Sequence, residues 1–230
     1  MTQEERFQKA VELLQEAYRL QMAGELEAAI EVARAFSALP KRPARSILIL
    51  GVTGEEKGLQ GSEYFARHPT VPIRSIVADV NLDFPTGWWE PHDIVALGAE
   101  HSTLMNDVRA ASQALGLSVS PDPEPEQVFF IRSDQYNFVK QGVPAVFPGA
   151  GRQDAEGKME KNRAYSDWWT KNRYHQPSDE WDPKLDYENM AKEVRADFLI
   201  ALAIAVDPER PRWNEGDVLG KMFGANAATR

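Results

Sequence analysis

The chain has 230 residues, of which 43% are hydrophobic and 27% charged, a composition that suits one compact domain with a sizeable core. Its formal net charge of −9 argues against nonspecific binding to nucleic acid, and no apolar run is long enough, at about 18 residues, to span a membrane. Because cysteine is absent, disulfides and thiolate metal ligands are excluded.

The first 39 residues are predicted to form a helical hairpin. Thr2 and Glu5 have the spacing of a capping box, and residues 25–39 read as a second helix that ends before Pro40. Apolar residues recur at helical spacing in the first helix: Phe7, Ala10, Val11, Leu14, Ala17, Tyr18 and Met22. A single helix pair cannot bury its own apolar face, so we expect it to pack on the rest of the chain or, alternatively, to form a homo-oligomer with a second copy.

A pair of carboxylates follows the next apolar run. Residues 46–53 read as a strand and residues 57–68 as a helix, with Glu55 and Glu56 between them. Open α/β sheets place their sites at the carboxyl ends of strands, and a buried carboxylate costs several kcal/mol unless it is compensated. The pair therefore suggests a reaction centre. The alternative is that the two acids begin a helix, where their negative charge interacts favourably with the helix dipole.

Two later segments add to this pair. In the apolar run 74–83, Asp79, Asn81 and Asp83 share one face by the strand period of two, and Asp83 lies where the strand should end. Residues 174–180 form a polar loop that holds His175, one of four histidines in the chain. Glutamate, aspartate and histidine together are a zinc ligand set.

Alternating strand and helix signals along the remaining sequence favour an α/β fold. Strands are predicted at 93–98 and 143–147, and helices at 103–115, 134–141 and 187–206. We expect residues 1–207 to form a single domain, with residues 208–230 as an extended C-terminal tail.

Several of these segments together resemble one family, the bacterial dizinc aminopeptidases of the secreted leucyl-aminopeptidase type. Glutamate carboxypeptidase II, glutaminyl cyclase and the transferrin receptor are its more distant relatives. The motifs that carry the resemblance are Gly54-Glu-Glu-Lys-Gly-Leu-Gln-Gly-Ser-Glu-Tyr-Phe65, Asn81-Leu-Asp-Phe84, Pro121 to Glu126 with Arg132-Ser-Asp134, Gly142-Val-Pro-Ala145 and Tyr174-His-Gln-Pro-Ser-Asp179. The resemblance implies a three-layer sandwich, in which helices flank a central, mostly parallel mixed sheet.

The resemblance also implies roles for individual residues. Glu55 corresponds to the general base, Glu56 and His175 to ligands of one zinc ion, and Asp83 to a ligand of the other. Tyr174 is a separate candidate from its place beside His175: it would help to polarise the carbonyl of a peptide substrate, and the alternative is a structural role. Zinc would lower the pKa of its bound water to about 7, and a carboxylate would take the proton.

The sequence departs from this family at its metal ligands. The family's bridging aspartate and the histidine of its His-x-Asp motif lie upstream of the Glu-Glu pair, yet no histidine precedes His68 and no aspartate precedes Asp79. A further family histidine is replaced by Gln135. We therefore expect at most one weakly bound zinc, held by Glu56 and His175 with possible help from Asp83.

Three functional interpretations follow from the resemblance and this deficit. The first is a zinc-dependent aminopeptidase with impaired hydrolysis of peptides. The second is a metal-poor relative that binds peptides or proteins without cleaving them. The third is a truncated or fusion product that associates through its N-terminal helices. Relatives are commonly exported, which favours a location outside the cytoplasm. Met1, however, opens directly into a charged helix without an apolar signal region, which favours the cytoplasm, so both locations stay open.

Overall fold

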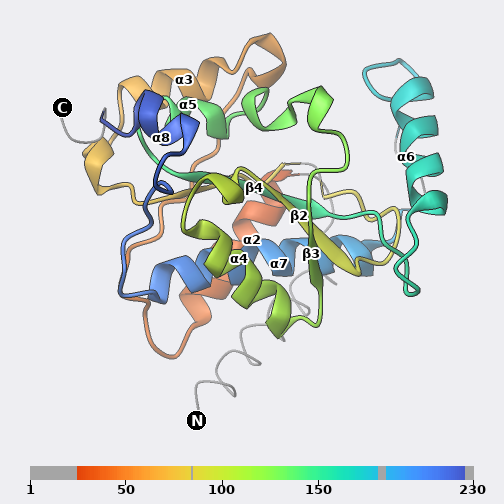
Figure 1. The fold of residues 1–230 in the computed structure, drawn as a ribbon, viewed down its shortest axis with the longest axis horizontal. Coiled ribbons are helices and arrows are strands. Elements are labelled where there is room, and N and C mark those ends of the chain that lie inside the picture. Colours follow the sequence, from red (N-terminus) through yellow and green to blue (C-terminus); the bar gives the residue numbers. More distant parts are fainter. Residues whose placement is uncertain (1–24, 84, 181–184, 226–230) are drawn as a thin grey trace.

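The computed structural model describes residues 25–83, 85–180 and 185–225. Its centre is a four-stranded sheet in the order β1-β4-β2-β3 (Figure 1). The strands are β1 (Asp79–Val80), β2 (Asp93–Leu97), β3 (Ser118–Ser120) and β4 (Ala145–Ala150). The pairs β1–β4 and β2–β3 are parallel, whereas β2–β4 is antiparallel. The predicted mixed, mostly parallel sheet is confirmed.

Helices cover both faces of this sheet. Helices α2 (Glu25–Ala38), α4 (Leu104–Ala114) and α7 (Tyr187–Val206) pack together on one face, and α3 (Gln60–Arg67) and α5 (Gln135–Val139) lie on the other (Figure 1). Neighbouring residues of β4 show the alternation: Val146 packs in the main core, while Ala145 packs in a smaller cluster with Val139 and Leu219. The structure is therefore the three-layer α/β sandwich that the family resemblance implied.

Helix α7 is the main support of the core. Asp186 caps its N-terminus, because the carboxylate accepts hydrogen bonds from the backbone N–H groups of Glu188 and Asn189. Phe198 on α7 is fully buried and packs against Phe36 of α2 with ring centroids 4.9 Å apart. The second helix of the predicted hairpin thus packs within the chain. The first helix, with Phe7, Leu14 and Tyr18, lies outside the described residues, so its packing stays a prediction.

The strand predicted at residues 46–53 does not form. No hydrogen bond links the backbone of residues 46–52 to the backbone of another described residue. The segment takes part in none of the three strand pairs of the sheet. The apolar, β-branched composition favours a strand only where a neighbouring strand supplies hydrogen bonds. The strand predicted over 74–83 shortens to Asp79–Val80 for a related reason, because β1 is an edge strand with a neighbour on one side only.

The extended tail predicted from residue 208 is also wrong for the described part, residues 208–225. Trp213 donates from Nε1 to the carbonyl of Gly142 at 3.1 Å, and Asp217 caps a short helix, α8 (Val218–Phe223). Leu219 of this helix is buried. The tail folds back because Trp213 and Leu219 offer apolar surface to the sheet domain.

One further helix, α6 (Glu160–Asn172), was not predicted; it stands at one end of the molecule (Figure 1). Among the described residues, no helix is both long enough and apolar enough to cross a membrane.

Candidate functional site

The two adjacent carboxylates lie in a short, tightly turned segment ahead of α3. Glu55 and Glu56 begin a single 3-10 turn over residues 55–57, which is flanked by Gly54 and Gly58 with φ values of 73° and 93°. These left-handed conformations favour glycine because other side chains are strained there. Gly61 on α3 allows the helix to approach closely, since a Cβ atom at this position would lie 2.4 Å from the carbonyl oxygen of Thr53.

The structure brings two of the predicted metal ligands into direct contact. The Nε2 atom of His175 lies 2.6 Å from Oε1 of Glu56, although the two residues come from segments far apart in the sequence. Both side chains are open to solvent, His175 at 50% and Glu56 at 66% of their full exposure. His175 has a φ of 56°, a conformation that is uncommon for residues other than glycine. Strained backbone of this kind often occurs at functional sites.

Tyr174 and Glu55 share the electrostatic environment of this contact. The ring of Tyr174 stacks on that of His175 with centroids 3.8 Å apart. Burial raises the pKa of Tyr174, and the nearby carboxylates of Glu56, Glu55 and Asp83 raise it further. The pKa of Glu55 is also raised, first by burial and then by Glu56 and Asp83. The five residues predicted to form the site therefore lie in one region.

Asp83 has a different partner from the other predicted ligands. Its Oδ2 accepts a hydrogen bond from the hydroxyl of Ser133 at 3.1 Å. In the part of the chain that the structure describes, no group of three or more histidine, aspartate or glutamate side chains is placed to hold a metal ion. A catalytic zinc ion normally has three protein ligands. The donor set here offers the pair Glu56 and His175, which does not fit a complete catalytic zinc centre.

A buried polar network supports the Asp83 side of the site, and sequence reasoning missed most of it. The amide of Asn81 donates to Oε1 of Gln135 at 2.9 Å and to the Ser133 hydroxyl at 3.3 Å. Gln135 is fully buried and donates to the carbonyl of Phe130 at 2.7 Å. Gln135 thus ties the strand end that carries Asn81 to the loop before α5. The shared strand face of Asn81 and Asp83 was the signal that the residues themselves gave for this network.

Aromatic side chains line the approach to His175. The ring centroid of Trp169, on α6, lies 4.8 Å from that of Trp88 and 5.6 Å from that of Tyr174. Trp168, its neighbour on the same helix, is 47% exposed and joins these rings through Tyr165, whose ring centroid lies 5.8 Å from that of Trp168 and 5.6 Å from that of Trp88. These rings form an apolar, partly open surface beside the Glu56–His175 contact, which we call the aromatic wall: Trp88, Trp168, Trp169 and Tyr174.

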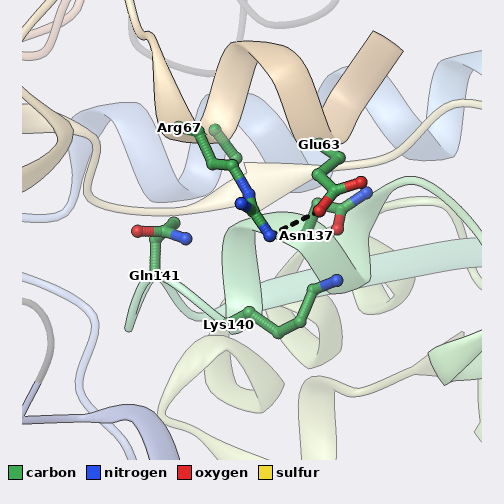
Figure 2. A pocket seen from close by; sticks show the side chains of 6 residues that line it. Glu63, Arg67, Asn137, Lys140 and Gln141 are labelled. Atoms are coloured by element: carbon green, nitrogen blue, oxygen red, sulfur yellow. Dashed lines mark ion pairs between the residues drawn. The ribbon is translucent and has the colours of Figure 1, made fainter. Parts of the chain in front are cut away.

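A hollow of about 420 Å³ lies elsewhere, between α3 and the end of α5. Figure 2 shows Arg67 and Glu63, both from α3 on one side of the hollow, joined by an ion pair whose N–O distance is 2.6 Å. Its other lining residues are Ala66, Asn137, Lys140 and Gln141. None of the predicted site residues lines this hollow, so the candidate site is an open surface rather than this cavity.

Comparison with known proteins identifies the family of this chain. The model of peptidase family M28 matches residues 23–198. Among solved structures, an aminopeptidase from Aneurinibacillus sp. strain AM-1 superposes with a TM-score of 0.53 at 19% sequence identity. The match covers 80% of this chain but only 39% of that aminopeptidase. No curated protein matches the chain. The family match agrees with the resemblance that the motifs indicated: the chain belongs to peptidase family M28.

Proposed function

We propose that this chain is a peptidase-type domain of the zinc aminopeptidase kind whose hydrolytic centre is incomplete. It binds peptides, holds at most one zinc ion weakly through Glu56 and His175, and hydrolyses peptide bonds poorly. The family match supports the peptidase class. The observation that carries the rest is the 2.6 Å contact between Glu56 and His175 without a third converging ligand among the described residues.

Glu55 is the residue to which we assign the role of general base. Its neighbour Glu56 is engaged with His175, whereas the side chain of Glu55 has no hydrogen bond or ion pair within the described part of the chain. A carboxylate in this position is available to take a proton from a water molecule that attacks a bound peptide. Asp83, whose Oδ2 accepts a hydrogen bond from Ser133, adds negative charge to the same region.

Zinc content tests the metal part of the proposal. We expect elemental analysis of the purified chain to find at most one zinc per molecule, and His175→Gln to weaken zinc affinity at least about tenfold. His68→Gln is the matched control, because His68 is also exposed but lies at the end of α3 outside the proposed site. Two tightly held zinc ions per chain, or equal losses in the two variants, would contradict the proposal.

Hydrolysis of an aminoacyl anilide tests the base. Whatever rate the chain shows, Glu55→Gln should lower it by about 10²–10⁴-fold while leaving zinc affinity nearly unchanged, because a general base is not itself a ligand. Glu160→Gln, an exposed glutamate at the start of α6, serves as the control. Full activity in the Glu55 variant would assign the base to another residue.

A second candidate function, peptide binding without cleavage, is favoured by the aromatic wall. Exposed tryptophan and tyrosine rings bind apolar side chains with little loss of conformational entropy. We expect a peptide with an apolar N-terminal residue to quench tryptophan fluorescence, and Trp168→Ala to weaken its binding. Mass spectrometry of the incubated peptide separates the two functions, since intact peptide supports binding alone and shortened peptide supports hydrolysis.

A further inference from the structure

Residues 46–53, which were predicted to form a strand but do not, carry an unusual exposed surface. Large apolar side chains at residues 47–52 face solvent, with exposed fractions of 37% for Ile47, 50% for Leu48, 42% for Ile49 and 37% for Val52. No charged residue occurs from Ser46 to Gly54. Soluble proteins usually protect such a segment with charges, proline or a covering element.

The backbone of this segment is equally available. Residues 46–52 make no backbone hydrogen bond with other described residues, so a row of N–H and C=O groups has no partner in that part of the chain. Extended apolar segments with free backbone groups bind another strand by completing a hydrogen-bonded ladder. Isoleucine, valine and threonine in the segment favour that conformation.

Both ends of the segment are fixed to the domain. The backbone N–H of Arg45 donates to Ala205 at 3.1 Å, and its guanidinium donates to the carbonyl of Ile204 at 2.6 Å. At the other end, the N–H of Gly61 donates to the carbonyl of Thr53 at 2.8 Å. Binding a second strand therefore orders little new backbone, which lowers the entropic cost of association.

The charges that flank the segment indicate which strand it accepts. Exposed Lys41 and Arg42 precede it, whereas Glu55 and Glu56 follow it. Asp83 and Asp134 add to the negative field at this second end, since both raise the pKa of Glu55. Lys57 and His175 also lie at this end, but the four carboxylates outnumber them and leave it acidic. In an antiparallel pair of identical segments, the basic end of each faces the acidic end of the other; a parallel pair would bring like charges together.

We propose that residues 46–53 form a homodimer interface in which the segments of two chains pair as antiparallel strands about a twofold axis. A pairing centred between Ile49 and Leu50 places Ser46 of one chain opposite Thr53 of the other. Such an interface is self-complementary, as twofold dimers require. Two paired strands of eight residues bury less surface than the about 1,200–2,000 Å² of a standard stable interface. We therefore expect a dimer that dissociates on dilution.

Sedimentation equilibrium of the full chain over a concentration series tests the proposal. The wild-type chain should dimerise, and Leu48→Lys should raise the dimer dissociation constant at least about tenfold, because it places a charged side chain in the apolar interface. Val218→Lys is the matched control, because Val218 is an equally exposed apolar residue on α8. Circular dichroism establishes that each variant is folded. A monomer at all concentrations, a dimer unaffected by Leu48→Lys, or open-ended fibres would overturn the proposal; an unaffected dimer would indicate another interface, such as the N-terminal helices.

Disulfide cross-linking tests the strand direction. Because the sequence contains no cysteine, only the introduced thiols can form a disulfide. Under oxidation, a mixture of Ser46→Cys and Thr53→Cys chains should form covalent heterodimers, while Ser46→Cys alone should stay largely monomeric on a denaturing gel. Efficient cross-linking of Ser46→Cys to itself would show parallel pairing and refute the charge argument. Failure of the mixture to cross-link, when the same protein is dimeric in solution, would place the interface elsewhere.

Discussion

The buried glutamate of α7 should make the stability of this domain depend on pH. Glu193 is 4% exposed, and its carboxylate accepts hydrogen bonds from the backbone N–H groups of Gly87 at 2.8 Å and Thr86 at 3.2 Å. Burial nevertheless dominates and raises the pKa of Glu193 from 4.5 to about 7. The folded chain therefore binds a proton at this site over a pH range in which the unfolded chain has released it.

The sign of the pH effect follows from this difference. Where the folded state binds more protons, the free energy of unfolding falls as the pH rises, here from about 4.5 through about 7. At 1.36 kcal/mol per pKa unit, the shift is equivalent to about 3 kcal/mol. Asp197, also buried on α7, acts in the same direction, because burial and then Glu193 raise its pKa.

Urea unfolding between pH 5 and pH 8 measures this effect in Glu193→Gln. We expect the wild-type chain to lose stability across this range and the variant to lose about 2–3 kcal/mol less, because part of the shift lies below pH 5. In the variant, an amide nitrogen replaces one of the two oxygens that accept hydrogen bonds from the backbone. A donor then faces a donor, which lowers the variant's stability at every pH by about 1–3 kcal/mol. The slope with pH is therefore the informative quantity, with Glu160→Gln as the exposed control. An unchanged or steeper slope in Glu193→Gln would refute the reasoning.

Three substitutions test the packing described above. Phe198→Ala should lower the free energy of unfolding by about 3–5 kcal/mol, because a fully buried ring is replaced by a cavity; a loss under about 1 kcal/mol in denaturant titration would contradict the core assignment. Gly61→Ala should cost about 1–3 kcal/mol, since its Cβ would lie 2.4 Å from the Thr53 carbonyl, and an unchanged melting temperature would mean that α3 can shift away. Trp213→Phe removes the hydrogen bond to Gly142 and should cost about 1 kcal/mol, measured against Trp168→Phe on the exposed face of α6.

The elements that the sequence predicted well are those with local signals. Helix α7 has Asp186 as a cap and a long apolar pattern, and its bounds match the prediction at both ends. Helix α6 was missed because its buried residues are the polar Asn162 and Ser166, so no apolar stripe marks it. The segment 46–53 has a strong strand composition, but a strand also needs a neighbour, which is a tertiary property.

The site was predictable to a similar degree. The resemblance brought Glu56 and His175 together, and no spacing in the sequence could have done so. Asp83 was expected at the end of a strand beside the pair, yet its partner is the Ser133 hydroxyl, because the hydrogen-bonded loop before α5 lies against that strand end. Side chains supplied by distant loops in this way cannot be read from periodicity.

The clamp that Arg45 makes on the end of α7 has a consequence for synthesis of the protein. Arg45 and its partner Ile204 are 159 positions apart, so this contact forms only after nearly the whole domain has left the ribosome. At translation rates of about 5–20 residues per second, the delay is roughly 8–30 s. Throughout that interval, α2 and the apolar run 46–53 emerge without α7 to hold them. Slow translation between residue 54 and the end of α7 lengthens this interval and should therefore lower the yield of soluble protein more than slow translation ahead of α2.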